Sequence, residues 1–405
     1  MKSKLIHILC LCVLLLGFTL KPEQARKPIT LKLLTQTTKV VAQDRVQLRF
    51  ETEAEDLKLL VSNALGSTVL EPETTSIQKS FLIQAPYANA SGKLDWKLIH
   101  NKNILMQGSL NIKPDTSKIA AIESYLGPQR ILAGGADFAQ LTLLATDVYD
   151  NLLPDATSLT LATRFKEQQQ TETLPVKNRI AWKNLFSPQK TGTMFTAVHL
   201  NERSSKLQTI YIDAHLATDF NITYERPNPF ADADQITTFK TGTIKDQYGN
   251  LISDATLVNF VIKTQDSQLL QTSGATLNGV AQAQILHPNR AQNWEVQAFI
   301  TGIAESNALT IAYAPALDAF PLEWDETKAV VKVGPLTGKL QQLLAEGTPV
   351  VLQLKSTKGT YTLEKKTQEG KVEFQLNTSF YKPGIYDLKV TVLGVSKTIE
   401  KINLY

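Results

Sequence analysis

Residues 147–157 read Asp-Val-Tyr-Asp-Asn-Leu-Leu-Pro-Asp-Ala-Thr, and residues 246–256 read Asp-Gln-Tyr-Gly-Asn-Leu-Ile-Ser-Asp-Ala-Thr. The second stretch follows the first at a distance of 246 − 147 = 99 residues. Recurrence at a fixed period indicates an array of one structural unit. A unit of about 100 residues with short strands and turns has the size of an immunoglobulin-like β-sandwich. The repeat therefore predicts an all-β chain of tandem immunoglobulin-like sandwiches.

A second recurring element is a strand near the end of each unit. Apolar side chains, with Thr196 as the exception, occupy every other position within residues 94–98, 194–200, 294–300 and 386–392. This alternation predicts a strand with one buried face. A polar turn and another apolar strand follow each run, which is the pattern of a hairpin. Four such hairpins predict four domains.

The domain boundaries follow from these repeats. Tyr125, Tyr224 and Trp324, which are 99 and 100 residues apart, are predicted to occupy the same position at the start of three units. The joints are too short to act as flexible tethers, so we expect a semi-rigid row of domains. The predicted ranges are 1–25 for a signal peptide, 26–113 for a divergent first domain, and 114–215, 216–317 and 318–405 for the others.

The first 25 residues have the order of a secretory signal. Lys2 and Lys4 precede the apolar run 5–20, and a polar segment follows. Retention of this run as a membrane anchor is the alternative. Both cysteines, Cys10 and Cys12, lie within it, so the processed chain would have no disulfide. We therefore expect an exported protein of the periplasm, the cell surface or the extracellular space, with no transmembrane span after signal removal.

The composition argues against several classes of partner. The 405 residues carry a net charge of only +4, and basic and acidic residues are interspersed. Nucleic-acid binding needs a concentration of positive charge, which this sequence does not have. The hydrophobic content of 43% is enough for each unit to bury a core of its own.

At the repeated residues the chain resembles the bacterial Ig-like repeats of the intimin and invasin type, called Big-1 domains. The third unit carries the pattern most fully, with Asp246 and Gly249-Asn250, then Gly279-Val280-Ala281, then residues 294–298. The resemblance extends over residues 115–405. It implies a bacterial stalk that projects a binding tip from the outer membrane. The chain departs from this plan, because we expect neither a barrel segment nor a lectin-like tip.

The repeated carboxylates raise the possibility of a calcium site. Calcium prefers clustered oxygen ligands, and the segment 225–234 with Asp232 and Asp234 offers a second candidate. The alternative is that Asp and Asn shape the turns through bonds to the backbone. We expect the turn role and no cofactor, with calcium left open. The residues in the repeat are Asp147, Asn151 and Asp155, and Asp246, Asn250 and Asp254.

No sequence pattern indicates catalysis. The histidines are scattered, with no spacing typical of metal ligands. There is no nucleophile elbow and no phosphate-binding glycine loop. Paired carboxylates need no local motif, but small sandwiches leave little room for a deep cleft. We therefore predict that the protein is not an enzyme, with no catalytic, metal or cofactor-binding residues.

The candidate partner-binding residues are Trp182, Lys183 and Phe186. By register with Gln282, Trp182 is predicted to point outward, where an exposed tryptophan could stack on a sugar or anchor a protein. Packing of Trp182 against a neighbouring domain is the alternative. Trp96 and Trp294, in contrast, are predicted to lie in the cores.

Together these observations predict a non-enzymatic, exported spacer or interaction protein of the bacterial cell envelope, either adhesin-like or a scaffold. Its partner would be a protein at the envelope or the cell surface, bound through strand edges or inter-domain grooves. The alternative is a glycan-binding accessory protein of polysaccharide metabolism.

Overall fold

The computed structural model describes residues 29–405 except 44, 74–75 and 377–378. The predicted signal peptide, residues 1–25, therefore lies outside the described residues. Every regular element within the described ranges is a β-strand, which confirms the all-β prediction. Over the same ranges, no helix is long and apolar enough to cross a membrane.

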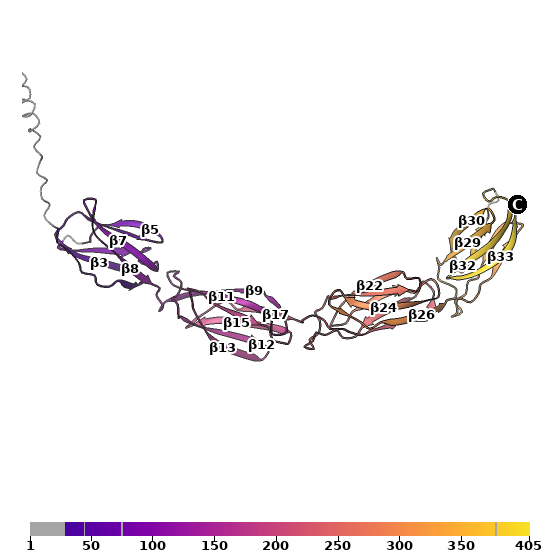
Figure 1. Cartoon of the computed structure of the whole chain (residues 1–405), viewed down its shortest axis with the longest axis horizontal. Helices are drawn as coiled ribbons and strands as arrows, with labels where there is room; N and C mark the ends of the chain where they lie inside the picture. The colour runs from indigo at the N-terminus through magenta and orange to yellow at the C-terminus, as the bar shows by residue number, and fades with distance from the viewer. Residues whose placement is uncertain (1–28, 44, 74–75, 377–378) are drawn as a thin grey trace, which may run out of the picture.

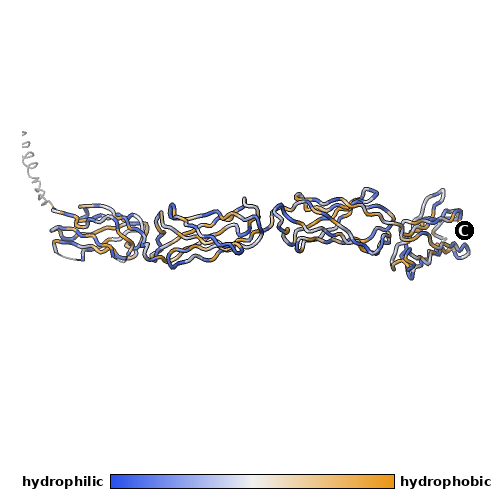
Figure 2. The backbone as a smooth tube through the Cα atoms, turned by 90° about the horizontal axis from the view of Figure 1, so that it is seen from below, coloured by the Kyte–Doolittle hydropathy of each residue, from blue (hydrophilic) through white to orange (hydrophobic). Residues whose placement is uncertain are grey.

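The buried apolar residues form four separate clusters. They span residues 42–112, 119–212, 214–313 and 316–404. We call the bodies around them domains 1 to 4. Figure 1 shows them in one row, joined end to end by short connections. Hydrophobic and hydrophilic positions alternate along the strands of each body (Figure 2), as expected where one face of a sheet packs on a core.

Domain 2 is a sandwich of a small and a large antiparallel sheet, with one parallel edge strand. The small sheet has the order β14 (Ala181–Phe186), β11 (Phe138–Asp147) and β9 (Ile119–Gly127). The large sheet has the order β10 (Arg130–Leu132), β17 (Gln208–Asp213), β15 (Gly192–Leu200), β12 (Ser158–Phe165) and β13 (Gln168–Pro175), and β16 (Arg203–Ser204) pairs with β15.

Domain 3 repeats this plan strand for strand, which is the structural counterpart of the sequence repeat. The small sheet has the order β18 (Ile222–Glu225), β20 (Ile236–Thr241) and β23 (Gln282–Leu286). The large sheet has the order β19 (Phe230–Ala231), β26 (Leu309–Pro315), β24 (Gln292–Ile300), β21 (Leu257–Thr264) and β22 (Leu269–Ala275), and β25 (Ala304–Glu305) pairs with β24.

Domains 1 and 4 are two-sheet sandwiches as well. Domain 1 has β1 (Leu31–Leu33), β3 (Arg45–Thr52) and β6 (Gln78–Gln84) in one sheet, and β2 (Lys39–Val41), β8 (Asn103–Lys113), β7 (Gly92–His100), β4 (Leu57–Asn63) and β5 (Gly66–Leu70) in the other. Domain 4 has β27 (Leu322–Asp325), β28 (Val330–Val333) and β31 (Val372–Gln375) in one sheet, and β30 (Gly359–Lys366), β29 (Pro349–Ser356), β32 (Gly384–Val392) and β33 (Val395–Leu404) in the other.

The predicted hairpin faces are buried as expected. Trp96 and Trp294 are only 4% and 1% exposed, and alternate residues of β32 line the core of domain 4. One register prediction is wrong. Tyr224 pairs with the buried Phe239, whereas Tyr125 pairs with Thr142 on the outer face of its sheet. A shift of one residue in a strand moves a side chain to the opposite face, so Tyr125 and Tyr224 are not equivalent.

The two sheets of domain 3 come close together at Gly274. A Cβ atom added to Gly274 would clash with the backbone oxygen of Gln282 in β23. Close by, the hydroxyl of Thr272 donates a hydrogen bond of 2.9 Å to the carbonyl of Gln284. The absence of a side chain at Gly274 therefore allows the edge strands β22 and β23 to meet.

We predict that Gly274→Ala destabilises domain 3 by about 1–3 kcal/mol, because a backbone atom must move to make room. The control is Gly242→Ala, whose Cβ would meet its nearest neighbour at 3.6 Å, an ordinary contact. Hydrogen exchange of peptides from β22 and β23 measures the difference. Equal protection in the two variants would contradict this account of Gly274.

Candidate functional site

The repeated motif forms a turn around one buried carboxylate. Asp246 is 4% exposed, and its Oδ1 accepts hydrogen bonds from the backbone N–H groups of Tyr248 (2.9 Å) and Asn250 (2.8 Å). In domain 2, Oδ1 of Asp147 accepts the same two bonds from Tyr149 and Asn151, both at 2.9 Å. An aspartate that bonds to the backbone two residues later stabilises a tight turn. The geometry therefore explains why both repeats carry aspartate.

The second oxygen of the same carboxylate binds the first residues of its domain. Oδ2 of Asp246 accepts a bond of 2.9 Å from the backbone N–H of His215, where the chain leaves domain 2. Oδ2 of Asp147 accepts a bond of 2.7 Å from the N–H of Asp115, where the chain leaves domain 1. Each carboxylate thus fixes the connecting segment against the turn.

The asparagine of each motif reaches into the preceding domain. Nδ2 of Asn250 donates to the carbonyl of Gln189 (2.8 Å), and Oδ1 accepts from the N–H of Thr191 (3.2 Å). We call the pair Asp246 and Asn250, and its counterpart Asp147 and Asn151, an Asp–Asn clasp.

The clasp between domains 1 and 2 has the same bonds. Nδ2 of Asn151 donates to the carbonyl of Asn89 (2.8 Å), and its Oδ1 accepts from the N–H of Ser91 (2.6 Å). In both joints the amide binds the backbone of the loop that leads into the hairpin strand, β7 in domain 1 and β15 in domain 2. Binding to backbone groups places little demand on side-chain identity, which suits a joint that recurs along an array.

The tyrosine of each motif packs against the preceding domain, across the joint that its own clasp bridges. Tyr149 lies against the core of domain 1. The ring of Tyr248 lies against Gly134 of domain 2, where an added Cβ would come within 2.8 Å of the ring. The ammonium group of Lys190 also donates a bond of 2.6 Å to the carbonyl of Tyr248.

The joint between domains 3 and 4 is built differently. Residues 336–344 replace the motif, as the sequence indicates, and this described segment contains neither the aspartate nor the asparagine of the clasp. Instead, Phe230 of domain 3 packs against the core of domain 4. The hairpin at Gly394 lies against Arg290 of domain 3.

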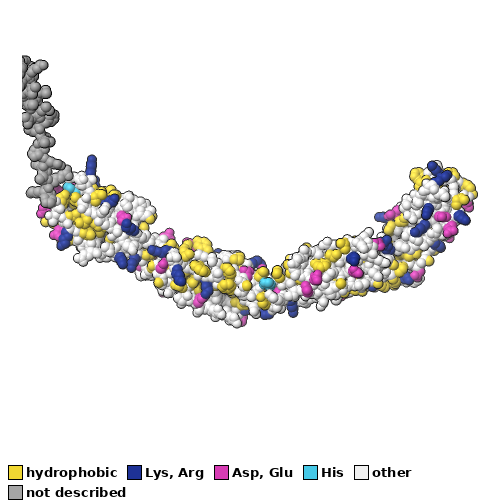
Figure 3. Space-filling view, in the orientation of Figure 1, with side chains coloured by type: hydrophobic (Ala, Val, Ile, Leu, Met, Phe, Trp, Pro, Cys, Tyr) yellow, Lys and Arg dark blue, Asp and Glu magenta, His cyan; other side chains and the backbone are white. Residues whose placement is uncertain are grey.

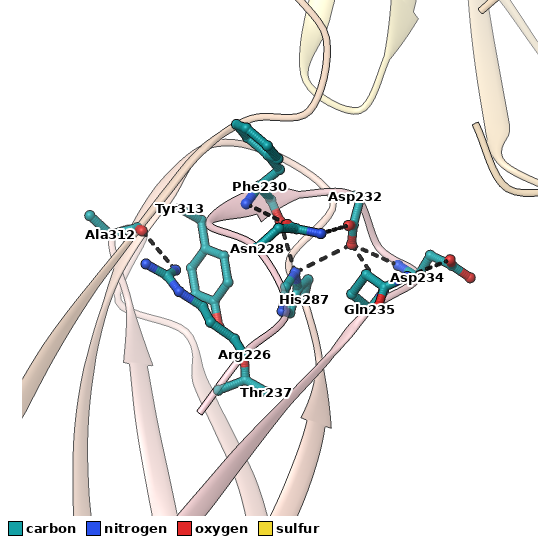
Figure 4. A network of polar contacts seen from close by, with 10 residues as sticks. All are labelled: Arg226, Asn228, Phe230, Asp232, Asp234, Gln235, Thr237, His287, Ala312 and Tyr313. Carbon is teal, nitrogen blue, oxygen red and sulfur yellow. Dashed lines mark hydrogen bonds and ion pairs between the residues drawn. The ribbon is translucent and has the colours of Figure 1, made fainter. Parts of the chain in front are cut away.

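Polar contacts shape the loop that carries Phe230 (Figure 4). The buried imidazole of His287 lies with Nδ1 2.8 Å from the carbonyl of Phe230 and 3.4 Å from Oδ1 of Asp232. That carboxylate oxygen also accepts the backbone N–H of Gln235 at 3.0 Å, and Oδ1 of Asn228 accepts the N–H of Phe230 at 2.8 Å. These contacts hold the loop in the shape that presents Phe230 to domain 4.

The carboxylates considered for calcium are occupied by protein donors. Both oxygens of Asp147 and Asp246 accept N–H bonds, and Asp155 and Asp254 accept the backbone N–H groups of Arg179 and Asn278. Among the described residues, no group of three or more His, Cys, Asp or Glu could hold a metal ion. The observed geometry is that of turn formation.

Hydrogen bonding keeps Asp246 ionised. Burial alone would raise the pKa of its carboxyl group, but bonds from the side chain and backbone of Asn250 and from the backbone of His215 and Tyr248 outweigh burial. The pKa of Asp246 therefore lies below its ordinary value. Its contribution to folding is complete above the unfolded pKa of about 4, and is lost as the pH falls through the lower folded value.

We predict that Asp246→Asn lowers the stability of domain 3 by about 2 kcal/mol at neutral pH, because hydrogen bonds to a charged acceptor are lost. The deficit relative to wild type should shrink as the pH falls from the unfolded pKa of about 4 through the lower folded value, because the wild-type carboxylate is then protonated as well. Calorimetric unfolding at neutral pH and along an acid pH series measures the deficit. A deficit independent of pH would show that the charge of Asp246 does not contribute.

We predict that the double variant Asn151→Ala, Asn250→Ala loosens two joints, because each clasp loses two inter-domain bonds worth about 1 kcal/mol each. Small-angle scattering of the full chain should show a broader distribution of inter-domain distances. Asn259→Ala is the control, since the side chain of Asn259 bonds only within domain 3. Scattering curves that coincide for all three proteins would contradict a role for the clasps.

A second candidate site is the outer face of the small sheet of domain 2. Trp182 and Phe186 are 53% and 55% exposed, as predicted for Trp182. The alternative, packing against a neighbouring domain, is not what the structure shows. The sequence did not reveal two further residues of this face, Tyr125 (57% exposed) and Phe138 (39% exposed). Tyr125 lies on it because Tyr125 and Trp182 both pair with Thr142, from opposite sides. Phe138 lies on it because it pairs with Phe186. Figure 3 shows hydrophobic side chains on the surface of domain 2.

Lys183 does not join this face. It alternates with Trp182 along β14, so its side chain points toward the large sheet, where its ammonium group lies 2.8 Å from Glu172. Lys183 and Glu172 instead line a groove of about 340 Å³ between the edges of the two sheets. The three predicted residues therefore lie on one strand but serve two surfaces.

Comparison with known proteins supports the fold. No family model and no curated protein matches this sequence. The structure is similar to that of FdeC, an Escherichia coli adhesin, with a TM-score of 0.51 and 16% identity over 71% of this chain and 99% of the other. It also matches invasin, a bacterial integrin-binding protein, with a TM-score of 0.43 and 12% identity over 84% of this chain and 79% of the other. At this identity the likeness concerns the fold, a row of Ig-like sandwiches.

Proposed function

We propose that this chain is a non-enzymatic, exported spacer and interaction protein of the bacterial cell envelope, adhesin-like or a scaffold. Its units would be Big-1-like Ig domains with the ranges 26–113, 114–215, 216–317 and 318–405, behind a signal peptide at 1–25. The observation that carries this proposal is the pair of Asp–Asn clasps, in which the asparagine of one domain bonds to the backbone of the preceding domain and so fixes how the two domains meet.

The construction suits a spacer. Each domain has a core of its own, to which its neighbours add only single contacts at the joints, such as Tyr149 on domain 1 and Phe230 on domain 4. The two clasped joints consist of directional hydrogen bonds to backbone groups and one packed tyrosine each, in place of a long linker. A short, bonded connection limits the relative rotation of two domains far more than a flexible chain would.

The surface of the described residues also favours a binding role over catalysis. One hollow there is an open groove between the edges of the two sheets of domain 2, beside Lys183 and Glu172, and another lies open on the outer face of the large sheet of domain 3, beside Val261 and Gln297. Enzyme sites are deeper and carry convergent polar groups with perturbed pKa values. The structural similarity to FdeC, a protein described as an adhesin, supports the adhesin form of the proposal.

The location is tested by protease treatment of intact cells followed by mass spectrometry. We expect peptides from domains 2 and 3 to be released from whole cells if the protein is an adhesin. The control is a known periplasmic protein, which should remain intact. Recovery of these peptides only after rupture of the outer membrane would rule out the adhesin form and leave the periplasmic scaffold.

A further inference from the structure

The outer face of the small sheet of domain 2 carries an unusual set of exposed rings. Tyr125 and Trp182 flank Thr142 from opposite sides, so that the three strands β9, β11 and β14 contribute one row. Strand spacing places the two outer Cα atoms about 10 Å apart. Phe138 and Phe186 form a second aromatic pair, with ring centroids 5.4 Å apart. Phe186 lies four positions after Trp182, which corresponds to about 13 Å along the strand. We call these four residues the aromatic face.

The repeats within the chain show that this composition is not required by the fold. In domain 3 the row equivalent to Trp182, Thr142 and Tyr125 is Gln282, Lys240 and Thr223. In domain 4 it is Glu373, Lys332 and Glu323. The same three-stranded sheet therefore forms with polar and charged side chains at these positions. The aromatic residues of domain 2 need an explanation other than folding.

The polar groups between the rings are almost all uncharged. Gln140 and Asn184 lie between the two aromatic pairs and share a hydrogen bond of 3.2 Å. Among the outward-facing residues of the three strands, Glu123 is the only charged one, and Tyr125 donates a bond of 2.8 Å to its carboxylate. This bond raises the pKa of Tyr125, so its hydroxyl stays protonated. Lys183, on the other side of β14, is paired with Glu172.

This combination fits one class of ligand. A pyranose ring presents C–H groups on its faces, and these are attracted to the electron-rich face of an aromatic ring. Its hydroxyl groups match the amide and hydroxyl groups of Gln140, Asn184 and Thr142, which offer both donors and acceptors. A face without a free cation has nothing to pair with an acidic polymer or an acidic peptide. Two aromatic pairs about 13 Å apart along the strand suit an extended ligand.

We propose that the aromatic face of domain 2 binds a neutral oligosaccharide. Tyr125 and Trp182 form one stacking position, Phe138 and Phe186 form the other, and Gln140 and Asn184 bond to the hydroxyl groups between them. The spacer role does not require this site, so either proposal can fail without the other.

Titration calorimetry of the full chain tests the proposal with cellohexaose, maltohexaose and mannohexaose, and with an oligogalacturonate as the charged comparison. We expect at least one neutral oligosaccharide to bind, and Trp182→Gln to weaken it by about tenfold or more. The substitution installs the residue that domain 3 carries at the same position, so folding should be preserved. Phe186→Leu, which installs the equivalent of Leu286, should weaken binding as well. Leu269→Gln alters an exposed residue of domain 3 and should change nothing.

Tryptophan fluorescence gives an independent readout. Of the four tryptophans, Trp182 is the only highly exposed one, since Trp96 and Trp294 are buried and Trp324 is half-buried. Binding should therefore shift the emission of the wild type to shorter wavelength and leave that of Trp182→Gln unchanged.

Three results would overturn the proposal. The first is the absence of binding to all three neutral oligosaccharides at millimolar concentration. The second is binding that Trp182→Gln leaves intact. The third is a dimer of the full chain in solution that Trp182→Gln dissolves, because the face would then be an interface between two copies.

Discussion

One buried carboxylate at each of two joints determines how consecutive domains meet. Asp147 and Asp246 each use one oxygen to form a turn and the other to hold the connecting segment. This turn also positions an asparagine whose side-chain amide binds the preceding domain. Without the carboxylate, the buried N–H groups would lose their acceptor and the asparagine would lose its position. Local turn chemistry and the placement of whole domains therefore depend on the same group.

Much of the fold could be predicted from the sequence because it depends on local periodicity. The repeat gives the length of the unit, and alternation along residues 294–300 identifies the buried face of β24. The register between distant strands is harder to predict from the sequence. Tyr125 and Tyr224 look equivalent at 99 residues apart, but the repeat spacing at this position is 98 residues, since Leu126 and Tyr224 share the inward position. A difference of one residue in a loop is enough to cause this error.

The candidate sites were predictable to different degrees. The turn role of Asp147 and Asp246 follows from their residue type. The reach of Asn151 and Asn250 into another domain does not, because it depends on how two separately folded bodies are placed. The one sequence signal for this contact between domains is that the two repeats are most similar at the turn and not at the core positions. On the aromatic face, exposure of Trp182 follows from alternation, but Tyr125 and Phe138 join it only through strand pairing.

The contrast between the clasped joints and the last one constrains the order of the units. A clasp needs two complementary parts, the motif in the following domain and a loop with free backbone groups in the preceding one. Domains 2 and 3 supply the motif, and the loops at Asn89 and Gln189 supply its targets. Domain 4 lacks the motif, and its core instead packs against Phe230 of domain 3. The modules are therefore not interchangeable: a recombined gene that placed domain 4 directly after domain 1 would join two surfaces with no matching parts.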